Sequence, residues 1–87
     1  MQYYVYIIQS KRDNSYYKGF SEDPIKRLEQ HNNKESEYTS NKVPWKLIYT
    51  EKFNSKREAL IREKNLKKYS LARLSLLIRS PKNDIEL

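Results

Sequence analysis

A single glycine, Gly19, is the feature that most constrains how this 87-residue chain can fold. It lies between a strand-like run, residues 16–20, and the helix-start pair Asp23-Pro24. A chain with one glycine needs it either for an unusual backbone angle or for a close approach that a side chain would block. Asp23 can cap the first helical turn, and proline suits the first helical position. We therefore expect a strand that turns sharply into a helix.

Two polar residues on that helix, Arg27 and His31, are four positions apart and share one helix face. Tyr17 lies on the preceding strand. The three side chains can therefore crowd one surface. That arrangement would suit the holding and cutting of a phosphodiester.

The remaining sequence predicts two more strands and two more helices. Runs of β-branched and aromatic residues predict the strands. The first strand is expected to be central in the sheet, because both of its faces are apolar. Asp13-Asn14 favours a hairpin turn, and Ser55 and Ser70 favour helix starts. The expected strands are residues 2–9, 16–20 and 45–53, and the expected helices are residues 24–32, 56–68 and 71–78.

This order of elements predicts an α+β fold, in which helices pack on a three-stranded, mainly antiparallel sheet. Ile25 and Leu28 are expected to face the core from the first helix. Ala59, Leu60 and Leu66 are expected to do so from the second. A chain of this length forms one domain, expected over residues 1–80, with a frayed tail at residues 81–87.

The chain is basic, with 18 lysines and arginines against 11 acids and a net charge of +7. Such a balance attracts polyanions, although it can also serve only to keep a protein in solution. Eight tyrosines add aromatic surface that can stack on bases or fill a core. The absence of cysteine excludes thiolate zinc sites, and no apolar run is long enough to span a membrane. We expect a cytoplasmic protein.

The chain contains an ordered set of short motifs. They are Tyr4-Val5-Tyr6, Tyr17-Lys18-Gly19, Arg27, His31, the Tyr38-Thr39 pair and Glu63. Each motif alone is weak, but the set at these spacings is fairly specific, and it resembles the GIY-YIG nuclease family, especially its small stand-alone bacterial members. The likeness covers most of residues 3–69.

The resemblance implies a phosphodiesterase that uses one divalent cation, Mg²⁺ or Mn²⁺, bound by Glu63. It implies that Arg27 neutralises the scissile phosphate and that Tyr6 is the base or orienter of the attacking water. Tyr17 and His31 would assist. A free tyrosine has a pKa near 10, so as a base Tyr6 would need a nearby cation to favour its phenolate.

DNA is the expected partner, with RNA as the alternative polymer and no membrane. The basic and aromatic residues expected to contact it are Lys18, Lys26, Tyr38, Lys64, Lys67 and Lys68. Each candidate also has an ordinary structural interpretation. The tyrosines could fill the core, Arg27 and His31 could lie on the surface, and Glu63 could form a helix salt bridge.

The sequence departs from the family pattern at several positions. Tyr4 and Val5 stand where glycine and isoleucine are usual, and Lys18 stands in place of isoleucine. Alternation puts Lys18 on the opposite face from Tyr17, where its stem could cover apolar surface or its ammonium could reach substrate. Asn65 matches the family's late asparagine only by identity, so its role stays open.

We expect a metal-dependent endonuclease-like domain that hydrolyses DNA phosphodiester bonds. With no DNA-reading domain in this sequence, its activity should be structure-selective or weakly specific, in DNA repair or processing. One rival is a nucleic-acid-binding module with weak or no turnover. The other is an accessory subunit that binds a protein partner through the helix at residues 71–78.

Overall fold

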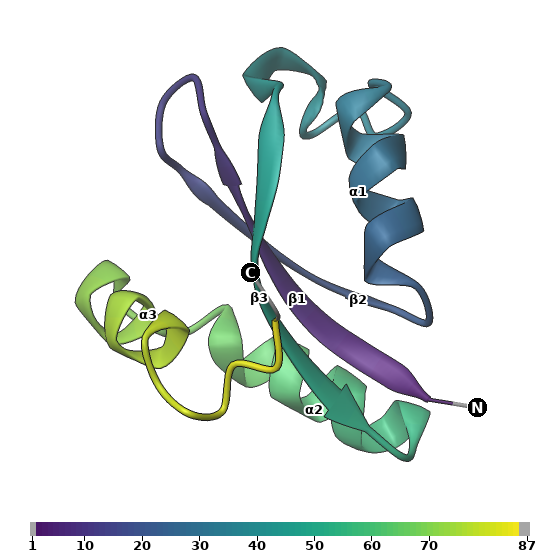
Figure 1. The fold of residues 1–87 in the computed structure, drawn as a ribbon, viewed down its shortest axis with the longest axis vertical. Coiled ribbons are helices and arrows are strands. Elements are labelled where there is room, and N and C mark those ends of the chain that lie inside the picture. The colour runs from purple at the N-terminus through teal and green to yellow at the C-terminus, as the bar shows by residue number, and fades with distance from the viewer. Residues whose placement is uncertain (1, 86–87) are drawn as a thin grey trace.

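The computed structural model describes residues 2–85 and confirms the α+β prediction (Figure 1). Three antiparallel strands form one sheet, and helices cover both of its faces. Of the helices in residues 2–85, none is long and apolar enough to cross a membrane. In chain order the elements are β1 (Tyr3–Ser10), β2 (Tyr16–Ser21), α1 (Pro24–Asn32), the 3₁₀ turn η1 (Ser40–Lys42), β3 (Trp45–Phe53), α2 (Lys56–Leu66) and α3 (Leu71–Ile78).

β1 is the central strand, as its two apolar faces predicted, and the strand order is β2-β1-β3. Side chains alternate along β1, so it contributes to two separate cores. The core under α1 contains Tyr6, Ile8, Trp45 and Leu47. The core under α2 and α3 contains Val5, Ile7, Tyr49, Ala59, Leu66, Leu74 and Leu77.

An irregularity in β3 lets that strand serve both cores. Ile7 pairs with Tyr49 while its neighbour Ile8 pairs with Leu47, so Ile48 is an extra residue at this point. Strict alternation would have turned Leu47 and Tyr49 to the same face. The bulge instead directs Leu47 towards α1 and Tyr49 towards α2 and α3.

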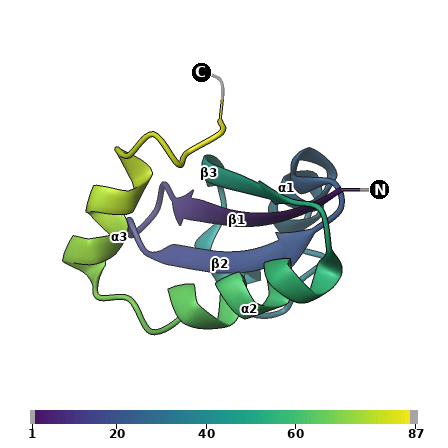
Figure 2. The ribbon, with the colours of Figure 1, turned by 90° about the horizontal axis from the view of Figure 1, so that it is seen from below.

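A partly buried ion pair fixes α2 to β3. Arg62 donates its Nε–H to Glu51 Oε1 over 3.0 Å, and the Tyr49 hydroxyl donates to the same carboxylate. Both charged side chains are less than one-fifth exposed. A charge pair this shielded resists separation better than a surface pair. It therefore holds α2 in place along β2 (Figure 2).

All three predicted helix caps form. The side chains of Asp23, Ser55 and Ser70 each accept a backbone N–H from the first turn of their helix. The helices at residues 24–32 and 71–78 have the predicted bounds, whereas α2 ends at Leu66 rather than near residue 68.

Two of the predicted core contacts are wrong. Ile25 is 60% exposed and Leu60 is 41% exposed. Each follows a buried residue, Pro24 or Ala59, and successive side chains on a helix point about 100° apart. In α1 the buried face instead consists of Pro24 and His31, with Leu28 packed against the core.

The expectation that residues 81–87 fray is wrong for residues 83–85, and residues 86–87 lie outside the described part of the chain. Asn83 donates its Nδ2–H₂ to the carbonyls of Ile48 and Ile78, each over 2.9 Å. Asp84 N–H donates to Thr50 O over 2.8 Å. The tail therefore covers part of the outer edge of β3, where strand polar groups would otherwise lack protein partners.

Gly19 serves the close approach of a side chain rather than an unusual backbone angle, since its φ is not positive. It pairs with Tyr6 across the β1–β2 ladder, and the Tyr6 ring lies over it. A Cβ on residue 19 would collide with the Tyr6 hydroxyl and with ring carbons Cζ and Cε1. The absence of a side chain here is therefore what lets Tyr6 reach across β2.

We predict that Gly19→Ala lowers the free energy of unfolding by about 1–3 kcal/mol, the usual cost of an overpacked contact. The same substitution in a Tyr6→Leu background should cost less, because the shorter side chain does not cover residue 19. Urea unfolding of the four proteins in this cycle measures the coupling. Equal costs in the two backgrounds would contradict the packing explanation.

Candidate active site

A buried chain of hydrogen bonds begins at Tyr6. Its hydroxyl lies 3.0 Å from His31 Nε2, and His31 Nδ1 lies 2.8 Å from Thr39 Oγ1. The Thr39 hydroxyl in turn donates to the Ser36 carbonyl over 3.4 Å. Tyr6, His31 and Thr39 are each at most 1% exposed. His31 is thus neither a surface residue nor an isolated core residue, and its ring links β1 to the loop after α1.

Tyr17 packs beside this chain and lies between it and solvent. Its ring centroid is 5.0 Å from that of His31 and 6.4 Å from that of Tyr6. On its other sides it meets Tyr38 at 5.8 Å and Trp45 at 6.4 Å. Of the predicted catalytic set, Tyr6, Tyr17 and His31 therefore lie in contact with one another, and aromatic edges shield the Tyr6–His31 bond from water.

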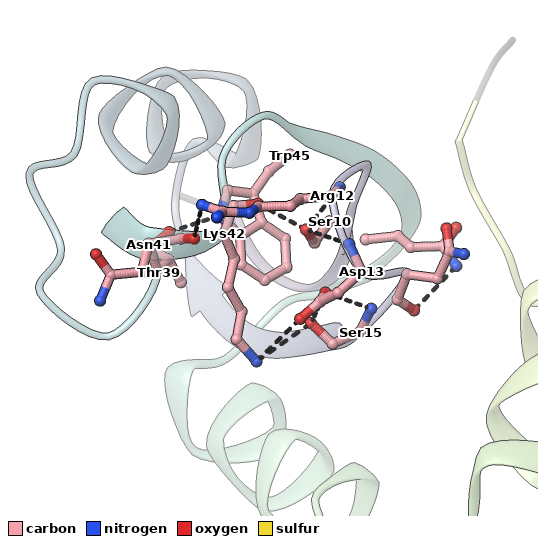
Figure 3. Close-up of polar contacts among 10 residues, drawn as sticks. Ser10, Arg12, Asp13, Ser15, Thr39, Asn41, Lys42 and Trp45 are labelled. Atoms are coloured by element: carbon pink, nitrogen blue, oxygen red, sulfur yellow. Dashed lines mark hydrogen bonds and ion pairs between the residues drawn. The ribbon is translucent and has the colours of Figure 1, made fainter.

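The loop that carries Thr39 and Tyr38 is fastened to the β1–β2 hairpin (Figure 3). Ser10 donates its hydroxyl to Lys42 O over 2.6 Å, and Arg12 donates to Asn41 O over 2.9 Å. Trp45 Nε1 donates to the Thr39 carbonyl over 3.0 Å. The sequence predicted only an irregular loop here. These bonds give that loop a fixed position.

Arg27 lies one helical turn before His31 and is half-buried, as its spacing predicted. Its guanidinium donates to Gln30 Oε1 over 2.8 Å. The positive charge of Arg27 lowers the pKa of both Tyr6 and His31, the two partners of the buried hydrogen bond. Arg27 therefore lies within electrostatic reach of the hydroxyl end of Tyr6.

Glu63 approaches from α2, which packs on the face of the sheet opposite α1. It does not touch the aromatic group directly. Its carboxylate is about one-fifth exposed, lies 4.0 Å from Lys67 Nζ, and contributes to raising the pKa of Tyr6. That influence places Glu63 within electrostatic reach of Tyr6, although from the other side of the edge strand β2.

A metal ion at this site would rely on one carboxylate. Within residues 2–85, no three His, Asp or Glu side chains lie close enough together to share an ion. This donor set does not suit zinc, but it fits Mg²⁺, which keeps several water ligands and binds through one or two carboxylates. Lys67 Nζ lies 4.0 Å from the Glu63 carboxylate, so a cation that binds this carboxylate would compete with the Lys67 ammonium.

Burial keeps the Tyr6–His31 pair neutral at neutral pH. It raises the pKa of Tyr6 to about 12, helped by the neighbouring Tyr17, against the opposing effect of Arg27. Burial also lowers the pKa of His31 to about 4, helped by the Arg27 charge. Desolvation thus outweighs the guanidinium, and Tyr6 is not a phenolate at rest.

An open cleft of about 420 Å³ lies beside Tyr17. It is lined by Tyr16, Tyr17, Lys18, Tyr38 and Lys67. Tyr38 is 71% exposed, so much of its ring is available for contact. Lys18 pairs with Ile7 and so points to the face opposite Tyr17, as alternation predicted, yet it still borders the cleft at the edge strand.

The other predicted nucleic-acid contacts are dispersed. Lys26 lines a separate hollow of about 330 Å³ that it shares with Arg27. Lys64 lies on the outer face of α2 beside Leu60 and Ile61. Lys68 follows α2 and is exposed, as is Asn65 within it. Of the predicted lysines, only Lys18 and Lys67 therefore border the cleft next to Tyr17.

The sequence interpretation assigned no role to three residues that help build the site. Thr39 carries the far end of the hydrogen-bond chain, Trp45 packs on Tyr17 and holds Thr39, and Tyr16 lines the cleft. For Thr39, the Tyr38-Thr39 pair of the family motif was an available signal. The contacts of Trp45 join segments that are distant in sequence, so no local pattern predicts them.

These features define a GIY-YIG-type site on a GIY-YIG-type fold. The profile of the GIY-YIG catalytic domain matches residues 2–75, and the chain belongs to this family. Membership indicates a nuclease-like function and a nucleic acid as the class of substrate.

Within the family the chain resembles the UPF0213 proteins. The UPF0213 protein YazA of Bacillus subtilis is 36% identical over 85 residues, covering 97% of this chain and 85% of that protein. A UPF0213 protein of Staphylococcus saprophyticus is 41% identical over 70 residues, covering 79% and 84%. The solution NMR structure of a UPF0213 protein from Bacillus halodurans has a TM-score of 0.61 at 33% identity, covering 97% of this chain and 89% of that one.

The low pKa of His31 predicts a loss of stability in mild acid. The folded state disfavours the imidazolium, so the unfolded chain binds more protons between its ordinary pKa of 6.5 and about 4. The stabilisation is complete above pH 6.5 and declines as the pH falls. We expect the free energy of unfolding to drop by roughly 2 kcal/mol between pH 7 and pH 5.

Urea unfolding at pH 7, 6 and 5 measures this change. His31 is the only histidine, and Asp13, whose pKa is lowered to about 2 by hydrogen bonds from Ser15, titrates far below this range. His31→Gln should therefore be less stable than the parent at pH 7 but nearly insensitive to pH over the same interval. A parent protein with constant stability from pH 7 to pH 5 would contradict the prediction.

Proposed function

We propose that this chain is a metal-dependent endonuclease-like domain that hydrolyses phosphodiester bonds of DNA, with selectivity for branched, nicked or single-stranded structures in repair or processing. The observation that carries the proposal is the Tyr6–His31–Thr39 hydrogen-bond chain, with Arg27 close to its Tyr6 end. A core tyrosine packed for stability alone does not require a buried histidine partner and a nearby unneutralised guanidinium.

In this proposal Arg27 binds the scissile phosphate. A guanidinium can hold two phosphate oxygens at once and stabilises charge that builds on them during attack. In the described structure its guanidinium donates to the neutral Gln30 amide and also acts on the Tyr6 hydroxyl, and no carboxylate is paired with it. Arg27 is therefore free to take an anionic partner without breaking an ion pair.

Tyr6 acts as the orienter of the attacking water. When its hydroxyl donates to His31 Nε2, 3.0 Å away, the lone pairs of its oxygen can accept a hydrogen bond from water. With a pKa raised to about 12, Tyr6 supplies position rather than a standing negative charge. Tyr17 excludes bulk water from this pair.

The proposed cofactor is one Mg²⁺ or Mn²⁺ ion bound through the Glu63 carboxylate. When bound, such an ion stabilises negative charge on phosphate and leaving-group oxygens. The protein supplies the Glu63 carboxylate. Lys67 balances the negative charge of that carboxylate when no metal ion is bound.

The cleft beside Tyr17 is the proposed binding surface for the strand. Exposed tyrosine rings stack on bases of any sequence, and lysines neutralise the phosphates between them. Tyr16, Tyr38, Lys18 and Lys67 supply both kinds of group within one hollow. Stacking and phosphate contacts of this kind also suit RNA, so RNA is the alternative substrate. The proposed location is the cytoplasm.

A second candidate is a nucleic-acid-binding module with weak or no turnover. The high pKa of Tyr6 and the Glu63–Lys67 pair favour it, because both oppose the charges that chemistry requires. A protein-binding accessory role is favoured by Leu71 and Leu76 of α3, which are 70% and 63% exposed. Magnesium-dependent cleavage across a panel of branched, nicked and single-stranded DNA and RNA separates the enzyme from both.

We predict that Glu63→Gln abolishes metal-dependent cleavage and leaves DNA affinity unchanged or slightly higher, because it removes a negative charge that repels the polyanion. Arg27→Ala should lose affinity and lose at least about 10²-fold in rate, the usual worth of one such donor. Arg27→Lys should recover binding further than cleavage, since lysine restores charge but not the two-pronged contact.

Single-turnover rates and equilibrium affinities of the three variants test this prediction. Glu58→Gln, on the exposed first turn of α2, and Arg79→Ala, at the end of α3, are the matched controls and should behave like the parent. If Glu63→Gln cuts at the parent rate in magnesium, the proposed metal site is wrong.

The position of each lysine predicts the salt dependence of binding. Lys18→Gln and Lys67→Gln should each reduce the slope of log affinity against log salt by about 0.7–0.9, the contribution of one phosphate contact. Lys56→Gln, on the outer face of α2, should leave the slope unchanged. Fluorescence anisotropy of a labelled oligonucleotide at several salt concentrations measures this, and a reduced slope for Lys56→Gln alone would move the binding surface to α2.

A further inference from the structure

We propose that Thr39 is a positioning residue that holds His31 in the Nδ1–H tautomer and thereby directs the Tyr6 hydroxyl proton onto His31 Nε2. The inference rests on the proposed nuclease function for its catalytic consequence. The tautomer itself is a property of the protein alone, so it can be tested without cleavage.

The hydrogen-bonding partners of Thr39 determine which group donates and which accepts along the Tyr6–His31–Thr39 hydrogen bonds. A threonine hydroxyl has one proton and can also accept, whereas the Ser36 carbonyl can only accept. The Ser36 carbonyl lies 3.4 Å from the Thr39 hydroxyl and is a protein acceptor for its proton. With the proton directed there, the hydroxyl accepts at its shorter 2.8 Å contact with His31 Nδ1, and this arrangement places a proton on Nδ1.

The other end of the imidazole supports the same assignment. With the proton on Nδ1, Nε2 has a lone pair and accepts from the Tyr6 hydroxyl at 3.0 Å. In the opposite tautomer the Tyr6 proton would need a different acceptor. The cation beside it, Arg27, can only donate. Among the described residues, the Nδ1–H tautomer is the arrangement that gives the protons of Tyr6, His31 and Thr39 each a protein acceptor.

Burial makes this choice depend on Thr39 rather than on water. His31 and Thr39 are both 0% exposed, and every buried side-chain nitrogen and oxygen in the described residues has a hydrogen-bond partner. An unpaired Nδ1–H in such a site is disfavoured, because a buried donor without a partner loses its hydrogen bond to water and gains none in the protein. Without the Thr39 oxygen, His31 gains by moving its proton to Nε2, where the Tyr6 oxygen can accept it.

The surrounding segments fix Thr39 itself. Trp45 Nε1 donates to its carbonyl over 3.0 Å, and Ser10 holds the following turn through Lys42 O over 2.6 Å. The threonine oxygen therefore has a set position relative to α1.

The catalytic consequence follows from the lone pairs of Tyr6. When Tyr6 donates to His31, its oxygen can accept from a water in the site. When His31 instead donates to Tyr6, one acceptor position of that oxygen is used and the hydroxyl proton points elsewhere. Loss of the Thr39 oxygen should therefore lower the rate without lowering DNA affinity, because Thr39 is buried and does not contact the cleft.

The experiment compares Thr39→Val, which keeps the shape and removes the hydroxyl, with Thr39→Ser, which keeps the hydroxyl. Nitrogen-15 NMR at pH 7 distinguishes a protonated from an unprotonated ring nitrogen, and long-range couplings identify Nε2 because it couples to both carbon-bound ring protons. The signals need no assignment to a residue because His31 is the only histidine. We expect Nδ1–H in the parent and in Thr39→Ser, and a shift towards Nε2–H in Thr39→Val. The single-turnover rate should fall at least about 10-fold in Thr39→Val and recover in Thr39→Ser, with unchanged affinity.

A parent His31 protonated on Nε2 would overturn the proposal, as would an Nδ1–H tautomer retained in folded Thr39→Val. If Thr39→Val does not fold, the tautomers of the parent and of Thr39→Ser decide the assignment. If the parent cuts none of the nucleic acids while the tautomers behave as expected, the nuclease function fails and the positioning role of Thr39 stands.

Discussion

The close approach of the Tyr6 ring to Gly19 is the contact on which the site depends. Because residue 19 has no side chain, Tyr6 can extend from the central strand across β2 and reach His31 on α1. One missing methyl group on an edge strand thus determines where the buried Tyr6 hydroxyl meets His31.

The same geometry imposes an electrostatic cost. Drawing Tyr6 and His31 into the core moves both pKa values away from neutrality, to about 12 and about 4, and only Arg27 opposes the shift of Tyr6. The resting site is therefore neutral at the tyrosine–histidine pair and positive at the guanidinium. A positive guanidinium beside a neutral pair suits the binding of an anionic substrate, before further negative charge develops on that substrate during the reaction.

The site also depends on elements from both faces of the sheet. Tyr6, Tyr17 and His31 lie on the α1 face, whereas Glu63 belongs to a helix packed on the other face and anchored by the Arg62–Glu51 ion pair. The two groups can approach each other only around β2, because it is the edge strand. A wider sheet would separate them, so the small number of strands is part of how the site is built.

The sequence alone determined the features that depend on neighbours in the chain. The three strands and the caps at Asp23, Ser55 and Ser70 follow from local periodicity and stereochemistry. The sequence also marked Gly19 as its single glycine, although the Tyr6 ring that requires it comes from another strand. The family motifs added the grouping of Tyr6, Tyr17 and His31. Only the tertiary structure decided what depends on residues distant in sequence: the Thr39 partner of His31, the exposure of Ile25, the separation of Lys64 from Lys67, and the tail held by Asn83. Hydrogen bonds and burial between distant segments are set by how the layers pack, and no local pattern encodes that packing.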